Sequence, residues 1–304
     1  SGLPGVIEAY EALPRGIQRY SELRMLMHAW ARFDPEGSIE YTQELGRDEA
    51  RFARMVAVSS WAMQDPDGAI EWSKERIGQS KYNPYMAGII GGVVQIDLNR
   101  ATDLLFEMPY GHERGRALEL VISKAIQQGG ARSLIQWTNN FPGERDPRLT
   151  NGTYGYVGHE LSRNDIDLAK QWALGLGSGE PKRRAVAEVA KQISEKETPL
   201  EAVDWLSQMP EEDQYAALPG VISRWASGEP AEAGEWLKKL PASEQMDGAV
   251  EAYVKAIRHE NPDSALEWAN SITNDKRRDS MVKYLERAQH ERDQRQRRRE
   301  GGNP

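Results

Sequence analysis

The five histidines are the residues of this chain most suited to metal or acid–base chemistry: His28, His112, His159, His259 and His290. The segment HELSR at 159–163 contains the first half of the H-E-x-x-H pattern, in which two histidines four residues apart on one helix bind zinc. Arg163 stands where the second histidine would have to be. The sequence therefore predicts no metal site, and each histidine is expected to be a surface or packing residue.

Other catalytic chemistry has little support. The chain has no cysteine, so disulfides, thiolate nucleophiles and cysteine-based zinc sites are excluded. No nucleophile elbow, P-loop or dinucleotide-binding glycine pattern stands in a suitable context. The acidic residues mostly fall at helix starts or on solvent faces, although folding could still bring a carboxylate pair together. We expect no catalytic residue, no cofactor and no enzymatic activity.

Composition limits the remaining classes. The 304 residues are 39% hydrophobic and 28% charged, as in a polar globular protein. The apolar run MAGIIGGVV at 86–94 is too short to cross a bilayer. Lack of cysteine fits an exported or periplasmic protein slightly better than a cytosolic one, although many cytosolic proteins share it. A net charge of −8 and a pI near 5.4 argue against general affinity for nucleic acid.

The C-terminal tail is the exception to this acidic character. The segment Arg287–Glu300 holds six arginines against three acidic residues. It is either a solvated helical extension or a contact for an acidic partner or nucleic acid.

The nine tryptophans reveal an internal repeat. Anchor residues at the end of a recurring segment stand 31 to 35 residues apart: Tyr41, Trp72, Leu104, Trp137, Trp172, Trp205, Trp236 and Trp268. Three further tryptophans, Trp30, Trp61 and Trp225, lie four residues before the cap of the same unit. All nine therefore occupy two columns of one repeat, which predicts that they pack between neighbouring units and do not form a ligand site.

Two more columns fix the register. The cap column, seven before each anchor, contains Asp34, Asp65, Asp97, Gly130, Asp165, Thr198, Glu229 and Asn261. Asp, Asn and Thr are suited to capping a helix N-terminus, and the proline that follows five of these caps suits the first helical position. Thr198 and Glu201 have the spacing of a capping box. The small column, four after the cap, contains Ser38, Ala69, Ala101, Leu134, Ala169, Ala202, Ala233 and Ala265. A Gly or Pro five beyond the anchor ends six of the eight units.

A second helical pattern precedes each cap. Residues 56–64, 117–128, 185–194 and 249–257 place apolar side chains at three- and four-residue steps. Each unit is thus predicted to be a helical hairpin. The sequence indicates an all-α protein, a right-handed α/α solenoid of about eight hairpins with a capping C-terminal helix.

This pattern resembles the tetratricopeptide-like repeats, with the divergent consensus W-A-x-x-D-P-x-x-A-x-x-W. The resemblance rests on the period, the early small residue and the aromatic one turn later, and it extends from about residue 15 to 290. The aromatic follows the alanine by three residues where those repeats usually have four. The resemblance implies a scaffold that binds peptides or partner domains along a concave face.

The domain boundaries follow from the repeat. We expect one repeat domain over residues 1–288 and a basic polar tail over 289–304. Residues 3–13 look like the end of a repeat unit, which suggests that the chain opens inside one, but residues 3–10 also resemble the first-helix segment 218–225. Residues 276–288 read as a first helix without its mate, which would cap the last hydrophobic surface.

The repeat departs from its consensus in units three to five. Val93, Ile126 and Leu161 replace the first-helix tryptophan, and six glycines appear: Gly88, Gly91, Gly92, Gly152, Gly155 and Gly158. These glycines mark either close helix crossings and a longer loop or a widened groove. In the second case the groove would be lined by Tyr82, Tyr85, Tyr154, Tyr156 and His159, whose side chains are suited to binding surfaces.

We therefore expect a non-catalytic scaffold that binds an unidentified protein or peptide. Two alternatives remain. One is an α/α-toroid enzyme acting on polysaccharide, which would need a pocket of converging carboxylates or Tyr and His. The other is a nucleic-acid-binding helical repeat similar to the pentatricopeptide proteins, which would need a basic inner face.

Overall fold

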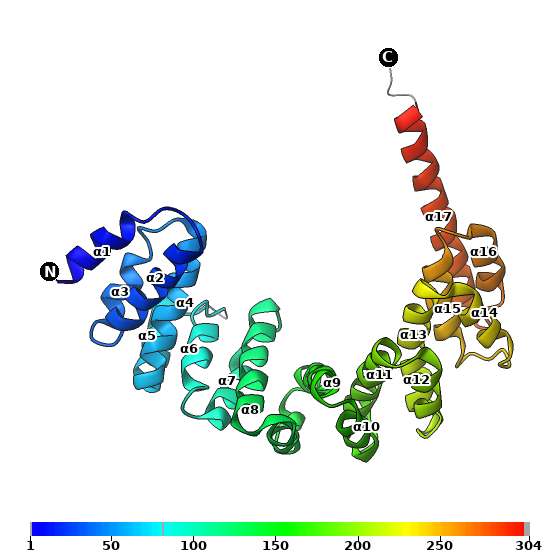
Figure 1. Cartoon of the computed structure of the whole chain (residues 1–304), viewed down its shortest axis with the longest axis horizontal. Coiled ribbons are helices and arrows are strands. Elements are labelled where there is room, and N and C mark those ends of the chain that lie inside the picture. Colours follow the sequence, from blue (N-terminus) through cyan, green and yellow to red (C-terminus); the bar gives the residue numbers. More distant parts are fainter. Residues whose placement is uncertain (1, 81, 301–304) are drawn as a thin grey trace. The chain divides into compact units, whose positions relative to one another are not determined.

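The structure of the protein is a computed structural model that describes residues 2–80 and 82–300 (Figure 1). Over these residues the chain forms 17 α-helices and one 3₁₀ turn, η1 (Gly143–Arg145), and no strand. It divides into two compact units, Ser1–Leu149 and Thr150–Pro304, and the boundary lies inside helix α9. The prediction of an all-α protein is confirmed.

Unit 1 is a series of helices in which each packs on the next one or two along the chain. The first helices of successive hairpins, α2, α4, α6 and α8, contact one another in that order. The helices of unit 1 are α1 (Leu3–Glu11), α2 (Ile17–Trp30), α3 (Pro35–Tyr41), α4 (Arg47–Gln64), α5 (Pro66–Ile77), α6 (Met86–Val93), α7 (Leu98–Glu107) and α8 (His112–Asn139). This sequential packing is what a helical repeat produces.

Unit 2 repeats the arrangement. Its first helices α11, α13 and α15 contact one another in order, and each also packs on its hairpin partner. The remaining helices are α9 (Pro147–Asn164), α10 (Ile166–Gly175), α11 (Glu180–Lys196), α12 (Pro199–Leu206), α13 (Glu211–Gly228), α14 (Pro230–Lys238), α15 (Asp247–Ile257), α16 (Pro262–Asn270) and α17 (Asp275–Glu300). Helix α17 passes without a break through residue 289, where the tail was expected to begin.

The cap column starts the second helix of each hairpin, as predicted. Six of the eight caps accept a hydrogen bond from the backbone N–H three residues later, at 2.9–3.1 Å: Asp34, Asp65, Asp97, Asp165, Thr198 and Asn261. At Thr198 the hydroxyl also donates to the Glu201 carboxylate at 2.9 Å, so Glu201 completes this cap through the threonine side chain. Glu229 makes no such cap bond.

Gly130, in the cap column of the fourth unit, acts differently. Gly129 and Gly130 interrupt the helical path inside α8, and Gly130 has φ +68°, in the left-handed region that favours glycine. The two predicted helices of this repeat are therefore joined by a sharp bend at Gly129 and Gly130, without a capping side chain.

The small and anchor columns form the core between hairpins. All eight members of the small column are 0% exposed. Six tryptophans are buried, and the other three, Trp61, Trp236 and Trp268, are half-buried. Neighbouring rings touch, as in the 5.3 Å approach of Trp61 to Trp72 and the 5.9 Å approach of Trp225 to Trp236. The tryptophans therefore lie in the packing between helices, as the repeat columns predict.

The helices of the chain are short or polar. None of those in residues 2–80 and 82–300 combines enough length with enough apolar character to cross a bilayer. The prediction of a single repeat domain over 1–288 stays a prediction.

Candidate functional site

Unit 1 contains a surface groove of about 1050 Å³ beside helices α4, α6 and α8. Its walls also include the α3–α4 connection and the segment 82–85 that leads into α6. Figure 1 shows α4, α6 and α8 following one another through unit 1. We call this hollow the α4–α6–α8 groove.

The groove lies along one face of three successive first helices. The second, third and fourth repeats have Met55, Ala87 and Leu120 at the position ten residues before the cap, and all three residues line the groove. Met55 is 48% exposed and Leu120 is 41% exposed. The same column in unit 2 contains Gly155, Glu188, Pro219 and Glu251. The first repeat has Arg24 in this column, so the apolar floor is formed by the second, third and fourth repeats.

Glycines bring two of these helices close together. A Cβ atom on Gly92 would lie 2.2 Å from the Ser59 carbonyl oxygen and 2.9 Å from the Ala62 Cβ. On Gly88, which lines the groove, it would lie 3.2 Å from Val58. Of the two interpretations of these glycines, close helix crossing therefore describes Gly88 and Gly92. Gly158 makes a similar approach to Ala185 in unit 2, whereas Gly152 faces open space.

Tyr82 and Tyr85 both line the groove, but they differ in how they are held. Tyr82 is 53% exposed. Tyr85 is half-buried and meets the Trp72 ring edge-on at 4.8 Å. Asn83 fixes the segment between them, because it accepts from the Tyr85 N–H at 2.9 Å and donates to the Ser73 hydroxyl at 2.9 Å. Tyr82 is thus presented to solvent from an anchored loop.

Arginines are the groove residues that the sequence analysis did not select. Arg47, Arg51, Arg54 and Arg116 line the groove together with only two acidic residues, Asp48 and Glu113. Arg51 forms an ion pair with Glu113 at 2.7 Å. The spacing of Arg47, Arg51 and Arg54, at i, i+4 and i+7 of one helix, places them on one face and was visible in the sequence.

The other three predicted site residues lie in unit 2, on α9. Tyr154 stacks on Trp172 with 6.1 Å between ring centres, and burial raises the pKa of its hydroxyl. The Tyr156 ring lies 6.5 Å from that of His159, whose Nδ1 is 3.0 Å from Glu188 Oε1. Tyr154 is therefore mainly a packing residue. A binding role for Tyr154, Tyr156 and His159 stays a prediction.

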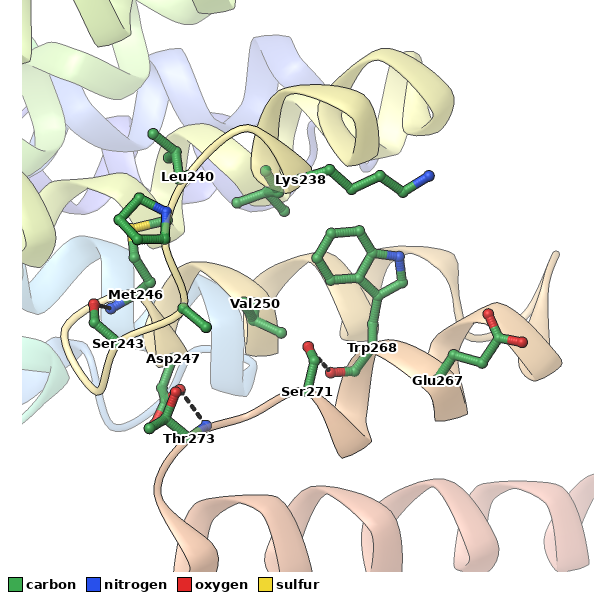
Figure 2. Close-up of a pocket in the computed structure, with 13 residues that line it drawn as sticks. Lys238, Leu240, Ser243, Met246, Asp247, Val250, Glu267, Trp268, Ser271 and Thr273 are labelled. Atoms are coloured by element: carbon green, nitrogen blue, oxygen red, sulfur yellow. Dashed lines mark hydrogen bonds between the residues drawn. The ribbon is translucent and has the colours of Figure 1, made fainter.

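Unit 2 also contains an apolar pocket of about 340 Å³ between the α14–α15 loop and α16. Figure 2 shows Trp268 and Val250 along it and Asp247 at one end, near Thr273. Asp247 is 1% exposed, and its two carboxylate oxygens accept from the Thr273 and Asn274 N–H groups at 2.8 and 2.9 Å. These bonds fix the α16–α17 connection, so the carboxylate has a structural role.

Among the residues whose side chains the structure describes, no three His, Asp or Glu side chains gather in a way that could hold a metal ion. His28, the histidine of the first hairpin, has its Nδ1 2.7 Å from the Ser60 hydroxyl.

Comparison with known proteins adds no further assignment. No protein-family model, curated protein or solved structure matches the chain.

Proposed function

We propose that this protein is a non-catalytic helical-repeat scaffold that binds a protein or peptide partner in the α4–α6–α8 groove. In this proposal the chain is a right-handed, tetratricopeptide-like solenoid of about eight hairpins, and the first helices line its concave face. The observation that carries the proposal is the convergence of the exposed side chains of Met55, Tyr82 and Leu120 on one groove.

The difference in burial between the columns of the repeat supports this function. The largest side chains of the repeat are used for packing, since the anchor and small columns are mostly buried. The residue ten positions before the cap differs from repeat to repeat. In the second and fourth repeats it is Met55 and Leu120, whose side chains are exposed to water. A contiguous exposed apolar patch with a polar rim is typical of an interaction site.

The length and openness of the groove favour a chain segment as the ligand. Three helices and a connecting loop contribute to its walls, and its volume of about 1050 Å³ exceeds what one side chain fills. An extended segment could contact the groove-lining residues of all three first helices in turn.

Selection from a randomised peptide display library, with the full chain as bait, tests the proposal. We expect enriched peptides to bind the wild type and to lose most of their affinity for the double variant Met55→Ser/Leu120→Ser. The matched control is Phe33→Ser/Ile96→Ser, which removes two exposed apolar side chains of unit 1 outside the groove. Helix content by circular dichroism would verify that both variants are folded.

Two results would contradict the proposal. One is the absence of any enriched peptide. The other is enriched peptides that bind the groove variant and the control variant equally well, because the groove would then not be their site.

A further inference from the structure

The arginines of the α4–α6–α8 groove define the charge of its ligand. The side chains of Arg47, Arg54 and Arg116 make no hydrogen bond or ion pair with any residue in the described parts of the chain. In unit 2 several cations of the first helices and of α17 are paired with acidic residues: Lys191 with Glu188, Arg224 with Glu195 and Arg277 with Glu251. Three unpaired cations in one groove are therefore a local property of unit 1.

This local charge is opposite to that of the chain. The protein as a whole has a net charge of −8, yet the groove has four arginines and two acidic residues. Arg24 extends the pattern, because it holds in the first hairpin the position that Met55 holds in the second and is exposed without a partner among the described residues. Guanidinium groups bind carboxylates in a bidentate manner, and such contacts are stronger where water is partly excluded.

We propose that the occupant of the α4–α6–α8 groove is an acidic peptide segment of a partner protein that also carries apolar side chains. Its carboxylates pair with Arg47, Arg54 and Arg116, and its apolar side chains lie against Met55, Tyr82 and Leu120. This inference rests on the proposed function and adds the chemistry of the partner.

The apolar residues distinguish a peptide from a nucleic acid. A phosphate backbone would also be attracted to the arginines, but a nucleic-acid site needs a broad basic surface, and this chain is acidic. Met55 and Leu120 are aliphatic, so of the three most exposed apolar side chains of the groove only Tyr82 could stack on a base. A mixed acidic and apolar peptide fits both the charge and the floor of the groove.

Fluorescence anisotropy with the full chain and five labelled probes tests the inference. The first probe is a 14-residue peptide in which Leu and Phe alternate with Glu and Ser. Three relatives replace its Glu with Gln, its Glu with Lys, or its Leu and Phe with Ser. The fifth is a single-stranded RNA of 14 nucleotides. We expect the acidic apolar peptide to bind most tightly, and its affinity to fall as NaCl rises from 50 to 500 mM.

Removal of the cations provides the residue-level test. The triple variant Arg47→Ala/Arg54→Ala/Arg116→Ala should bind the acidic apolar peptide about tenfold more weakly, because exposed ion pairs contribute modestly but act together here. The matched control Arg15→Ala/Arg32→Ala/Arg132→Ala removes the same charge from unit 1 outside the groove, and its affinity should stay within about twofold.

Charge reversal guards against a folding artefact. The double variant Arg47→Glu/Arg116→Glu should lose the acidic peptide and gain affinity for the Lys-containing relative. A misfolded protein would not show this gain.

Several outcomes would overturn the inference. If the Gln or Lys peptide binds the wild type as tightly as the acidic one, and binding depends on Met55 and Leu120, the groove is a peptide site without acidic preference; the proposed function then stands and the inference fails. If the RNA binds most tightly, the partner is a nucleic acid. If no probe binds in a groove-dependent way, the inference fails, and the display selection decides separately on the proposed function.

Discussion

At the scale of single residues, the buried tryptophans differ in how their indole N–H groups are satisfied. In unit 1 the Trp137 N–H donates to the Thr102 hydroxyl at 2.9 Å, and the Trp72 N–H donates to Glu36 at 3.2 Å. In unit 2 the Trp205 N–H is buried without a hydrogen-bond partner among the described residues. Trp137 and Trp205 occupy the same column and are 6% and 5% exposed, so they form a matched pair.

Replacement of each ring by phenylalanine should separate hydrogen bonding from packing. Both variants lose similar apolar area, but only Trp137→Phe loses a hydrogen bond, whereas Trp205→Phe removes an unpaired buried donor. We expect Trp137→Phe to lower the free energy of unfolding by about 1 kcal/mol more than Trp205→Phe does. Urea unfolding followed by circular dichroism measures this difference. An equal or larger loss in Trp205→Phe would contradict a stabilising contribution of the Trp137 hydrogen bond to the free energy of unfolding.

A second residue-scale feature is the pairing of buried Arg114 with Asp146. Arg114 is 6% exposed and donates to Asp146 at 2.7 Å and to the Leu105 carbonyl oxygen at 3.0 Å. The Leu149 N–H and the Arg114 guanidinium hold the pKa of the Asp146 carboxyl below its ordinary value. A depressed carboxyl pKa stabilises the fold above the unfolded-state pKa and loses this effect as pH falls through the folded-state pKa.

We therefore expect stability to fall below about pH 4, the ordinary range of an aspartate. Asp146→Asn should cost about 2 kcal/mol at pH 7, because it leaves Arg114 buried beside a neutral group. It should also make the loss of stability between pH 5 and 3 less steep. Thermal unfolding across this pH range measures both effects.

Asp103 provides the matched control for this prediction. It pairs with Arg145, and the two side chains are 62% and 42% exposed. Asp103→Asn should change stability by less than about 0.5 kcal/mol, since exposed ion pairs contribute little. Equal effects of the two substitutions would show that burial of Arg114 does not matter.

At the scale of elements, the crossing of α4 and α6 depends on glycine at one position and not at its neighbour. A Cβ atom on Gly92 would meet the backbone of α4, while one on Gly91 would come no closer than 3.5 Å to Leu120 or Ser59. Both residues lie in the same helix, so the two substitutions to alanine isolate the effect of the crossing.

Gly92→Ala should destabilise the protein by more than about 2 kcal/mol, because the added methyl forces the two helices apart. Gly91→Ala should leave stability unchanged or raise it by about 0.5 kcal/mol, because alanine favours the helix. The midpoints of thermal unfolding give the comparison. If both variants melt together, the close approach of α4 and α6 would be wrong.

The helices could largely be predicted from the sequence, because the residues that begin and end them lie close together in the chain. Capping by Asp65 or Asn261 depends on residues three positions away, so the cap column could be recognised without knowing the fold. The small column could be recognised because its spacing to the anchor recurs eight times. The bend at Gly129–Gly130 has no counterpart in the other units, and its left-handed backbone could not be read from the repeat.

The candidate site was predictable only in part, because it combines residues from several hairpins. Tyr82 and Tyr85 stood out as aromatics near unusual glycines, and both line the α4–α6–α8 groove. Arg54 and Arg116 are 62 positions apart in the chain, and they line one groove only because α4, α6 and α8 pack in series. Tyr154 has the same residue type as Tyr85, but only coordinates reveal its stacking on Trp172.

At the scale of the whole molecule, helix contacts join neighbours in the chain. Within each unit, the main packing contacts join each helix to the next one or two along the sequence, and the exposed Arg51–Glu113 ion pair also links α4 to α8. In such chains stability is close to a sum of unit and nearest-neighbour contributions. A local lesion should therefore have a local effect.

Native-state hydrogen exchange of the Gly92→Ala variant tests this expectation. Amides of α4 and α6 should exchange much faster than in the wild type, with smaller changes in α2 and α8. Amides of α13 and α15 in unit 2 should be unaffected. A uniform loss of protection across the chain would indicate a single cooperative unit instead.

This neighbour-to-neighbour packing also bears on how the protein is made. The contacts inside unit 1 need no residue beyond Leu149. As the polypeptide leaves the ribosome, each new hairpin can therefore find its packing surface already formed on the one before it. Translation at about 5–20 residues per second supplies a hairpin of this size every few seconds, so assembly can keep pace with synthesis.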